Sequence, residues 1–177
     1  MRLFTAIPLP NQTKESLRDI CRNQLPINYL NTANLHITLN FIGDVEDDKL
    51  EIIKQFFLNN TDNQKSFQIN LQRVIKFRQQ IHIVITPSKE LCDFQRKLDN
   101  AFKGISLTFE NRAYYPHIKL ANLRDERFLN QDKRLEDFPN KRLSEANFLA
   151  DKVCLYESKL LMHYAHHNLL EEIKLIT

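Results

Sequence analysis

Apolar and polar residues alternate through residues 34–43, and this pattern predicts a β-strand. The apolar positions are Leu35, Ile37, Leu39 and Phe41. With a side-chain period of two, these residues would face a core, while His36 and Thr38 would lie side by side on the other face of the strand. The sequence therefore predicts a strand that presents a histidine and a threonine to whatever that face lines.

A second stretch, residues 115–121, repeats this arrangement further along the chain. His117 is followed by the apolar Ile118 and then by the polar Lys119. The same alternation predicts that His117 and Lys119 share one face of a strand. We therefore expect two histidines from two strands to face each other across one cleft.

Periodicity along the rest of the chain predicts alternating helices and strands. Alternation and β-branched residues favour strands at residues 3–7, 67–75, 81–86, 105–109, 148–156 and 168–176, with a turn over 163–167. Apolar residues at helical spacing predict helices over residues 11–24 with Asn11 as N-cap, after Asp44 through Phe57, and from Ser88 to Gly104. Residues 124–140 are charged, and we expect a loop there with at most a short helical turn.

The order strand, proline, helix, loop and histidine strand occurs twice. The distance from Pro8 to His36 is 28 residues, and that from Pro87 to His117 is 30 residues. Such near-equal spacing favours two related halves, approximately residues 1–86 and 87–177. We therefore expect an α+β fold in a single bilobal domain over residues 1–177, with two helix-covered antiparallel sheets related by a pseudo-two-fold axis around a central cleft.

Composition adds limits to this picture. A chain of 177 residues is long enough for a substantial core, and a net charge of +3 permits a polyanionic partner without requiring one. Cys21, Cys92 and Cys154 form no CxxC pair, so we expect reduced, buried thiols. The short apolar start of the chain ends at Pro8, and no run reaches the roughly 20 apolar residues of a membrane span. We expect a cytoplasmic monomer that does not bind a membrane.

Two histidines in one cleft suit acid–base chemistry near neutral pH. One neutral imidazole can take a proton from water, and one protonated imidazole can give a proton to a leaving oxygen. Thr38 can donate a hydrogen bond to a substrate oxygen, and Lys119 can supply a point charge for a phosphate. An anionic phosphodiester would satisfy all four groups. A single histidine beside apolar residues is more often structural, so the paired arrangement of His36 and His117 carries this hypothesis.

Other polar residues have competing interpretations. The cluster of His163, His166 and His167 resembles a metal site, but Glu171 is the first carboxylate downstream, so we expect no metal and no cofactor. His82 is interpreted as structural. Tyr114 and Tyr115 either close the cleft or pack. A basic and aromatic group either contacts RNA or is a solvated strand end; it consists of Arg73, Lys76, Phe77 and Arg78.

With these residues, the chain resembles the 2H phosphoesterase superfamily, and within it the RNA 2′,3′-cyclic phosphodiesterases historically called 2′-5′ RNA ligases. The signature of that family is two His-x-Thr-x motifs on strands. The first is intact at residues 36–39, and the second reads His117-Ile118-Lys119-Leu120, with lysine in place of threonine. The resemblance runs from the opening strand, residues 1–10, to a late strand at residues 155–160.

The resemblance implies metal-independent hydrolysis of a terminal 2′,3′-cyclic phosphate on RNA to a 2′-phosphate, with a weak reverse 2′-5′ ligation as an extension. It implies that His36 is the proton donor, that His117 is the proton acceptor, and that Thr38 and Lys119 hold the phosphate. The expected nucleotide contacts are Phe41, Tyr115 and Arg124.

The altered second motif keeps alternatives open. Lys119 is expected to lower the pKa of His117 by like-charge proximity, which would favour a general base. The same change also permits a non-catalytic RNA or nucleotide-binding protein that has lost turnover. A phosphodiesterase of small cyclic nucleotides is a third interpretation.

Overall fold

The dominant element of the fold is a seven-stranded antiparallel sheet. The computed structural model of the protein describes residues 1–22, 34–105, 113–122, 135–160 and 165–177. The strands lie in the order β4-β5-β6-β2-β1-β8-β9. Their bounds, in that order, are Leu71–Phe77, Gln80–Ile85, His117–Asn122, His36–Asp44, Arg2–Pro8, Lys152–Leu160 and Ala165–Lys174.

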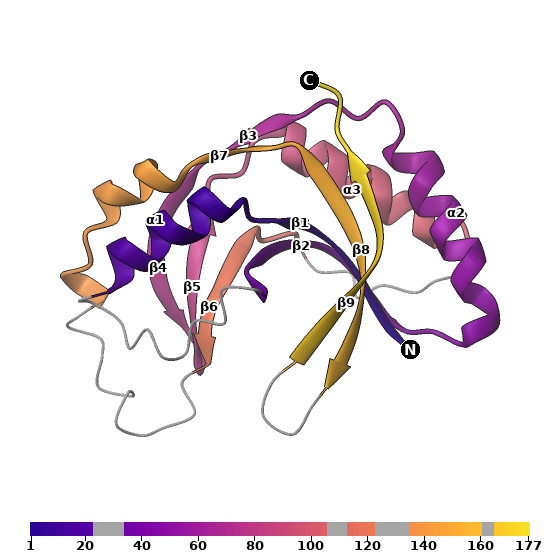
Figure 1. The fold of residues 1–177 in the computed structure, drawn as a ribbon, viewed down its shortest axis with the longest axis horizontal. Coiled ribbons are helices and arrows are strands. Elements are labelled where there is room, and N and C mark those ends of the chain that lie inside the picture. The colour runs from indigo at the N-terminus through magenta and orange to yellow at the C-terminus, as the bar shows by residue number, and fades with distance from the viewer. Residues whose placement is uncertain (23–33, 106–112, 123–134, 161–164) are drawn as a thin grey trace.

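The sheet is strongly curved, as Figure 1 shows. Strands β8 and β9 form one arm of an arch, β4, β5 and β6 form the other, and β1 and β2 cross between them. The two histidine strands, β2 and β6, are neighbours at the centre of the strand order. Segments that are far apart in sequence therefore meet at the middle of the sheet.

Two helices cover one face of this sheet and build the core with it. Helix α2 (Leu50–Thr61), which follows a short 3₁₀ helix at Asp47–Lys49, packs against α3 (Lys89–Lys103). Helix α3 contacts β2, and α2 contacts β8 and β9. The fully buried side chains on the two helices include Ile53, Phe57, Leu91, Leu98 and Phe102. These apolar stripes recur every three or four residues, which is why the periodicity of the sequence predicted both helices.

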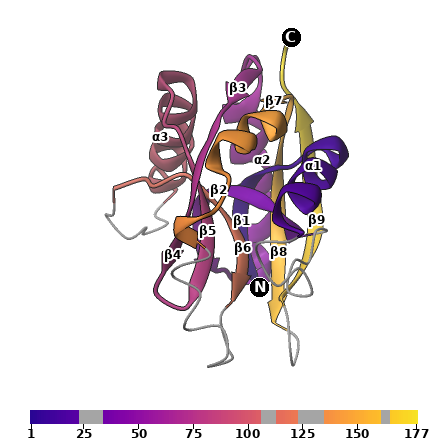
Figure 2. The ribbon, with the colours of Figure 1, turned by 90° about the vertical axis from the view of Figure 1, so that its left-hand side faces the viewer.

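Helix α1 (Asn11–Cys21) packs beside a second 3₁₀ helix, η5 (Asn140–Ala146), and η5 also contacts β4. In Figure 2, α1 and α3 lie on opposite sides of the molecule. The predicted N-cap at Asn11 is wrong: Pro10 occupies the cap position, and no side chain caps the helix. The ring of Pro10 fixes its φ, here −59°, while its ψ of 153° is extended, so the helix begins at the next residue.

A second, two-stranded sheet accounts for two differences from the sequence predictions. Strand β3 (Phe67–Ile69) pairs with β7 (Phe148–Ala150). The single strands predicted over residues 67–75 and 148–156 are thus each divided, because the chain leaves the small sheet at Asn70 and at Asp151 before it enters the large one. Alternation continues through both breaks, so periodicity alone could not locate them.

The predicted α+β fold class is confirmed, with both histidine strands in one continuous sheet. The turn predicted over residues 163–167 is wrong for its last three residues, which belong to β9. The strand predicted at residues 105–109, and most of the loop at 124–140, fall outside the described residues. Cys21 and Cys154 are buried and Cys92 is half-buried, all as free thiols. Among the described helices, none is long and apolar enough to cross a membrane.

Candidate active site

The register between β2 and β6 brings the two motifs together. Ile37 pairs with Ile118, and both side chains are completely buried on the core face. Because side chains alternate across a strand, the flanking residues point to the opposite face. In this antiparallel register His36 lies opposite Lys119, and Thr38 lies opposite His117.

These four side chains form a square, with the histidines on one diagonal. Cβ atoms of directly opposed residues lie about 5 Å apart in an antiparallel pair, and those of diagonal neighbours lie about 7–8 Å apart. Electrostatic interactions of His36 with both Lys119 and His117 are consistent with this placement. Two imidazoles at diagonal positions can contact one phosphate-sized group between them.

Both imidazoles are held by the same local hydrogen bond. His36 Nδ1 lies 2.7 Å from the carbonyl oxygen of Asn34, and His117 Nδ1 lies 2.8 Å from that of Tyr115. A carbonyl can only accept, so Nδ1 carries the proton in each ring. The Nε2 atom is then the nitrogen that takes up or releases a proton, and the two sites share one tautomer.

Aromatic rings enclose His36. The ring of Phe4, itself buried, has its centroid 5.0 Å from that of His36, and the ring of His167 lies edge-on at 5.3 Å. Burial lowers the pKa of His36 to about 4; the Asn34 carbonyl opposes this shift, and the nearby His167 and Lys119 add to it. His36 is therefore neutral at pH 7 in the substrate-free protein.

His117 has a different neighbour. Its ring stacks on that of His82, with centroids 4.2 Å apart and an angle of 18° between the planes. His82 is only 3% exposed, and its Nε2 lies 2.7 Å from Oε1 of Gln80. Burial, with a smaller contribution from His117 and Lys119, lowers the pKa of His82 to about 4. His82 is thus a buried neutral ring against which His117 lies.

The charge of Lys119 acts on three other histidine rings. It contributes to the lowered pKa of His36, His82 and His167, in each case after the larger effect of burial. The antiparallel register explains the effect on His36, since it places Lys119 directly across from that residue.

Two of the three expected nucleotide contacts can be located. The alternation predicted Phe41 on the core face, and this is wrong: Phe41 is 64% exposed, and its ring lies 6.2 Å from that of Phe4, which places it on the histidine face. A register shift in the pairing of β1 with β2, between Thr5 and Ala6, breaks the alternation before Phe41. Tyr115 is 47% exposed, and its ring lies 6.1 Å from that of His117. These rings are available for stacking near the two imidazoles, whereas Arg124 lies outside the described residues. The neighbouring Tyr114 packs, and its hydroxyl donates to the Thr38 carbonyl over 3.2 Å.

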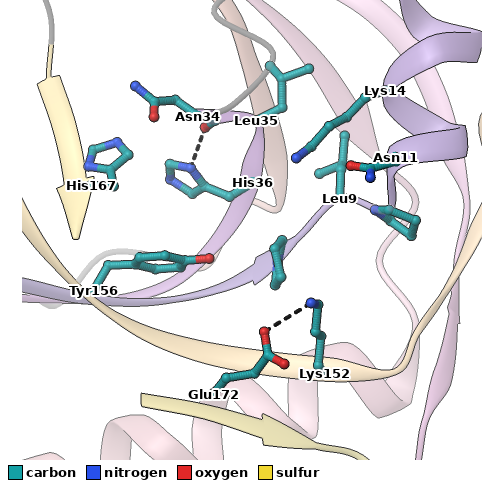
Figure 3. Close-up of a pocket in the computed structure, with 12 residues that line it drawn as sticks. Leu9, Asn11, Lys14, Asn34, Leu35, His36, Lys152, Tyr156, His167 and Glu172 are labelled. Carbon is teal, nitrogen blue, oxygen red and sulfur yellow. Dashed lines mark hydrogen bonds and ion pairs between the residues drawn. The ribbon is translucent and has the colours of Figure 1, made fainter. Parts of the chain in front are cut away.

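A cavity of about 340 Å³ adjoins His36. We call it the α1 cavity, because the start of α1 forms part of its wall. Figure 3 shows Lys14 from α1 and Lys152 from β8 turned toward the same space, with Tyr156 and His167 beside His36. The sequence analysis gave Lys14, Lys152 and Tyr156 no role in the site, and it considered His167 only as part of a metal cluster. These residues share no motif in the sequence. The pairing of β1 with β8 and of β8 with β9 brings Tyr156 and His167 near His36, and Lys14 reaches the cavity from α1.

The basic and aromatic group in the middle of the chain lies at the β4–β5 turn. Phe77 and Arg78 line a second pocket together with Gln79, Gln80 and Asn122. The Arg78 guanidinium lies 5.5 Å from the centre of the exposed Phe77 ring, in a cation–π contact. The pocket lies on the His82 side of the sheet, because Gln80 also contacts His82.

Two of the three C-terminal histidines lie within the described residues. His166 is exposed on β9, His167 contacts the His36 ring, and His163 lies outside the described residues. In the ranges that the structure describes, no three His, Cys, Asp or Glu side chains form a group that could hold a metal ion.

A central pair of strands that presents two histidines on one face of an antiparallel sheet matches the arrangement that the resemblance to the 2H phosphoesterases implies. Residues 8–160 match the 2′-5′ RNA ligase superfamily, and the chain belongs to that family.

Two archaeal proteins are similar to this chain over most of its length. An RNA 2′,3′-cyclic phosphodiesterase of Methanocaldococcus jannaschii is 27% identical over 168 residues, which is 90% of this chain and 92% of that protein. One of the same name from Methanothermobacter thermautotrophicus is 28% identical over 149 residues, 77% of each chain.

Two crystal structures share the fold. Escherichia coli LigT complexed with 3′-AMP has a TM-score of 0.76 at 20% identity, and TT0787 of Thermus thermophilus has a TM-score of 0.78 at 15% identity. Each likeness covers 99% of this chain and 98% of the other. The whole described architecture is therefore that of the solved structures.

Proposed function

We propose that this protein is an RNA 2′,3′-cyclic phosphodiesterase, which converts a terminal 2′,3′-cyclic phosphate to a 2′-phosphate and a free 3′-hydroxyl. The observation that carries the proposal is the diagonal placement of His36 and His117 across one strand pair, each with Nδ1 bonded to a backbone carbonyl. The names of the two archaeal relatives support the choice of substrate.

In the proposed reaction, a water oxygen attacks phosphorus and the bond to the 3′ oxygen breaks. His117 Nε2 accepts the proton that the water loses, and His36 Nε2 donates a proton to the departing 3′ oxygen. One water is consumed in each turnover, and proton exchange with solvent restores both rings. These two groups supply the proton transfers, so the proposed reaction needs no metal.

The low pKa of His36 adds a condition to this mechanism. A ring that is neutral at pH 7 in the free protein must gain a proton before it can act as an acid. A bound phosphodiester carries a negative charge, which favours the imidazolium form. Substrate binding and proton uptake at His36 are therefore coupled in this proposal.

The other site residues have roles in holding the substrate. The Thr38 hydroxyl and the Lys119 ammonium bind non-bridging oxygens of the phosphate, and charge-assisted contact with Lys119 stabilises its negative charge. The exposed rings of Phe41 and Tyr115 stack on the nucleotide, and Arg124 is assigned to it as well. When the 5′-hydroxyl of a second RNA replaces water, the same chemistry gives a weak 2′-5′ ligation.

The test is hydrolysis of a 5′-labelled oligonucleotide with a 2′,3′-cyclic phosphate end in the presence of EDTA. The wild type is expected to form the 2′-phosphate, and His36→Ala and His117→Ala are expected to lose about 10²–10⁴-fold in rate. His166→Ala is the matched control, since His166 is exposed on β9 and lies outside the proposed machinery. Conversion at the wild-type rate by either catalytic variant would remove the proposal.

Lys119 gives a specific reason to test a second candidate, a non-catalytic RNA or nucleotide binder. It replaces the motif threonine and disfavours the protonated form of His36. Binding of the cyclic-phosphate oligonucleotide without turnover, together with turnover in Lys119→Thr, would favour this candidate.

A further inference from the structure

The α1 cavity carries more positive charge than its walls neutralise. Lys152 Nζ lies 2.9 Å from a carboxylate oxygen of Glu172, so these two wall residues form a neutral pair. Lys14, on the opposite wall, makes no ion pair with any residue that the structure describes. The cavity therefore has one surplus ammonium group, facing a space of about 340 Å³.

The surroundings of Lys14 favour an anion as the ligand. Partial burial lowers the pKa of Lys14, and the charge of Lys152 lowers it further. Both effects would be relieved by a negative group between the two lysines. Figure 3 shows the ends of both lysine side chains directed into the cavity.

The start of α1 adds to this preference. Its first turn contains no acidic residue, and no side chain caps it. Pro10 and Asn11, at that start, line the cavity. The N-terminal end of a helix carries a partial positive charge, and here it lies at the same cavity as the surplus ammonium.

We propose that the α1 cavity binds the phosphodiester immediately upstream of the reacting nucleotide, so that the enzyme selects RNA ends over free cyclic mononucleotides. The inference rests on the function proposed above. His36 belongs both to the reacting pair and to the wall of the cavity, so the anion site lies next to the reacting phosphate. One phosphodiester charge matches one surplus ammonium. A 5′-phosphate on a mononucleotide presents the same chemistry and would occupy the same site.

A comparison of four substrates separates the effect of the upstream negative charge from the effect of the added nucleoside. They are adenosine 2′,3′-cyclic phosphate, its 5′-phosphorylated form, the dinucleotide ApA with a 2′,3′-cyclic phosphate end, and that dinucleotide with a neutral methylphosphonate linkage. We expect kcat/KM for the charged dinucleotide to exceed those for the unphosphorylated mononucleotide and the neutral dinucleotide by about tenfold. The 5′-phosphorylated mononucleotide shows whether a terminal 5′-phosphate alone gives the same increase in kcat/KM.

Lys14→Gln should reduce the ratio between the charged and the neutral dinucleotide to near unity. Lys97→Gln is the matched control, because Lys97 is exposed on α3 and lies outside both pockets. It should keep the ratio of the wild type. Equal kcat/KM for the charged and neutral dinucleotides in the wild type would overturn the proposal, and would show instead that any preference for dinucleotides comes from the added nucleoside.

Binding of the products keeps this test separate from that of the proposed function. Calorimetry with ApA 2′-phosphate, in charged and neutral-linkage forms, needs no turnover. Tighter binding of the charged form, lost in Lys14→Gln, would support the anion site even if no substrate were hydrolysed. Equal binding of both forms would overturn it, whatever the activity.

Discussion

The two histidine strands have the same local geometry but different surroundings. On both strands Nδ1 bonds to the carbonyl two residues earlier, over 2.7 Å for His36 and 2.8 Å for His117. The bond at His36 is partly buried, with Phe4 and His167 around the ring, whereas the bond at His117 is exposed and the ring stacks on His82. Two residues after the first histidine, on the same face of the strand, stands Thr38, whereas Lys119 stands in the same position after the second histidine.

This comparison separates two sources of function in one site. The backbone conformation around each motif sets the tautomer and the direction of the ring, and it is the same in both. The surroundings of each ring differ, and burial lowers the pKa of His36 to about 4. A low pKa in the free protein opposes the proposed donor role of His36, so in that role the ring depends on the negative charge of the bound phosphate to become protonated.

The largest expected effect distinguishes the acid from the base. His36→Ala should slow hydrolysis of the cyclic phosphate by about 10³-fold, because the 3′ oxygen then leaves without a proton. With a 4-nitrophenyl phosphodiester, whose leaving group needs no proton, the deficit of His36→Ala should shrink below about tenfold. Steady-state kinetics on both substrates give the comparison.

His117→Ala is the counterpart in that experiment. Its deficit should remain with both substrates, since water activation is still needed. If the 4-nitrophenyl substrate reduced the rate deficit of His117→Ala and not that of His36→Ala, the assignment of acid and base would be reversed.

The pH dependence of the free energy of unfolding measures the protonation of the buried rings of His36 and His82. His36 and His82 have pKa values of about 4 in the folded protein, below the ordinary 6.5. The unfolded chain therefore binds more protons between these pH values, and the free energy of unfolding falls as pH decreases from 6.5 to 4. The loss is about 3 kcal/mol for each ring.

Chemical denaturation across that pH range measures this loss. His82→Leu should reduce this slope, whatever its effect on stability at neutral pH, and His36 and His167, whose pKa values are also lowered, should account for the part that remains. An unchanged slope would mean that His82 does not titrate as described.

A smaller effect is expected from restoring the family threonine at the second motif. Lys119→Thr removes the proposed phosphate contact, so KM for the cyclic-phosphate oligonucleotide should rise by about tenfold. It also removes a positive charge opposite His36, so the pKa of His36 in the free protein should rise, as NMR titration of its ring can measure. An unchanged KM together with a higher kcat would indicate that Lys119 impairs the site rather than binding the phosphate.

The smallest effects concern the exposed rings. Phe41→Leu and Tyr115→Leu remove aromatic faces that are 64% and 47% exposed, and each should raise KM by about fivefold while kcat stays close to that of the wild type. Phe77→Leu tests whether the second pocket also contributes to substrate binding. A fall in kcat without a change in KM would assign the two rings to positioning of the histidines.

The sequence by itself determined the local features of this protein. The alternation around His36 and His117 predicted two strands, each with its histidine on the face opposite the buried isoleucine. The helical spacing of apolar residues predicted α2 and α3. These features follow from the periods of the strand and the helix, which a single segment expresses without reference to the rest of the chain. The division of the chain into halves 1–86 and 87–177 stays a prediction.

Only the tertiary structure decided which residues meet. The pairing of Ile37 with Ile118 placed Lys119 across from His36, where its charge helps to lower the pKa of that ring. The tertiary structure brought His82 to the ring of His117 and His167 to the ring of His36, and it placed Lys14 and Lys152 in one cavity. A period shows which face a residue occupies but carries no information on register or strand order, and those depend on how distant segments bury their apolar faces together.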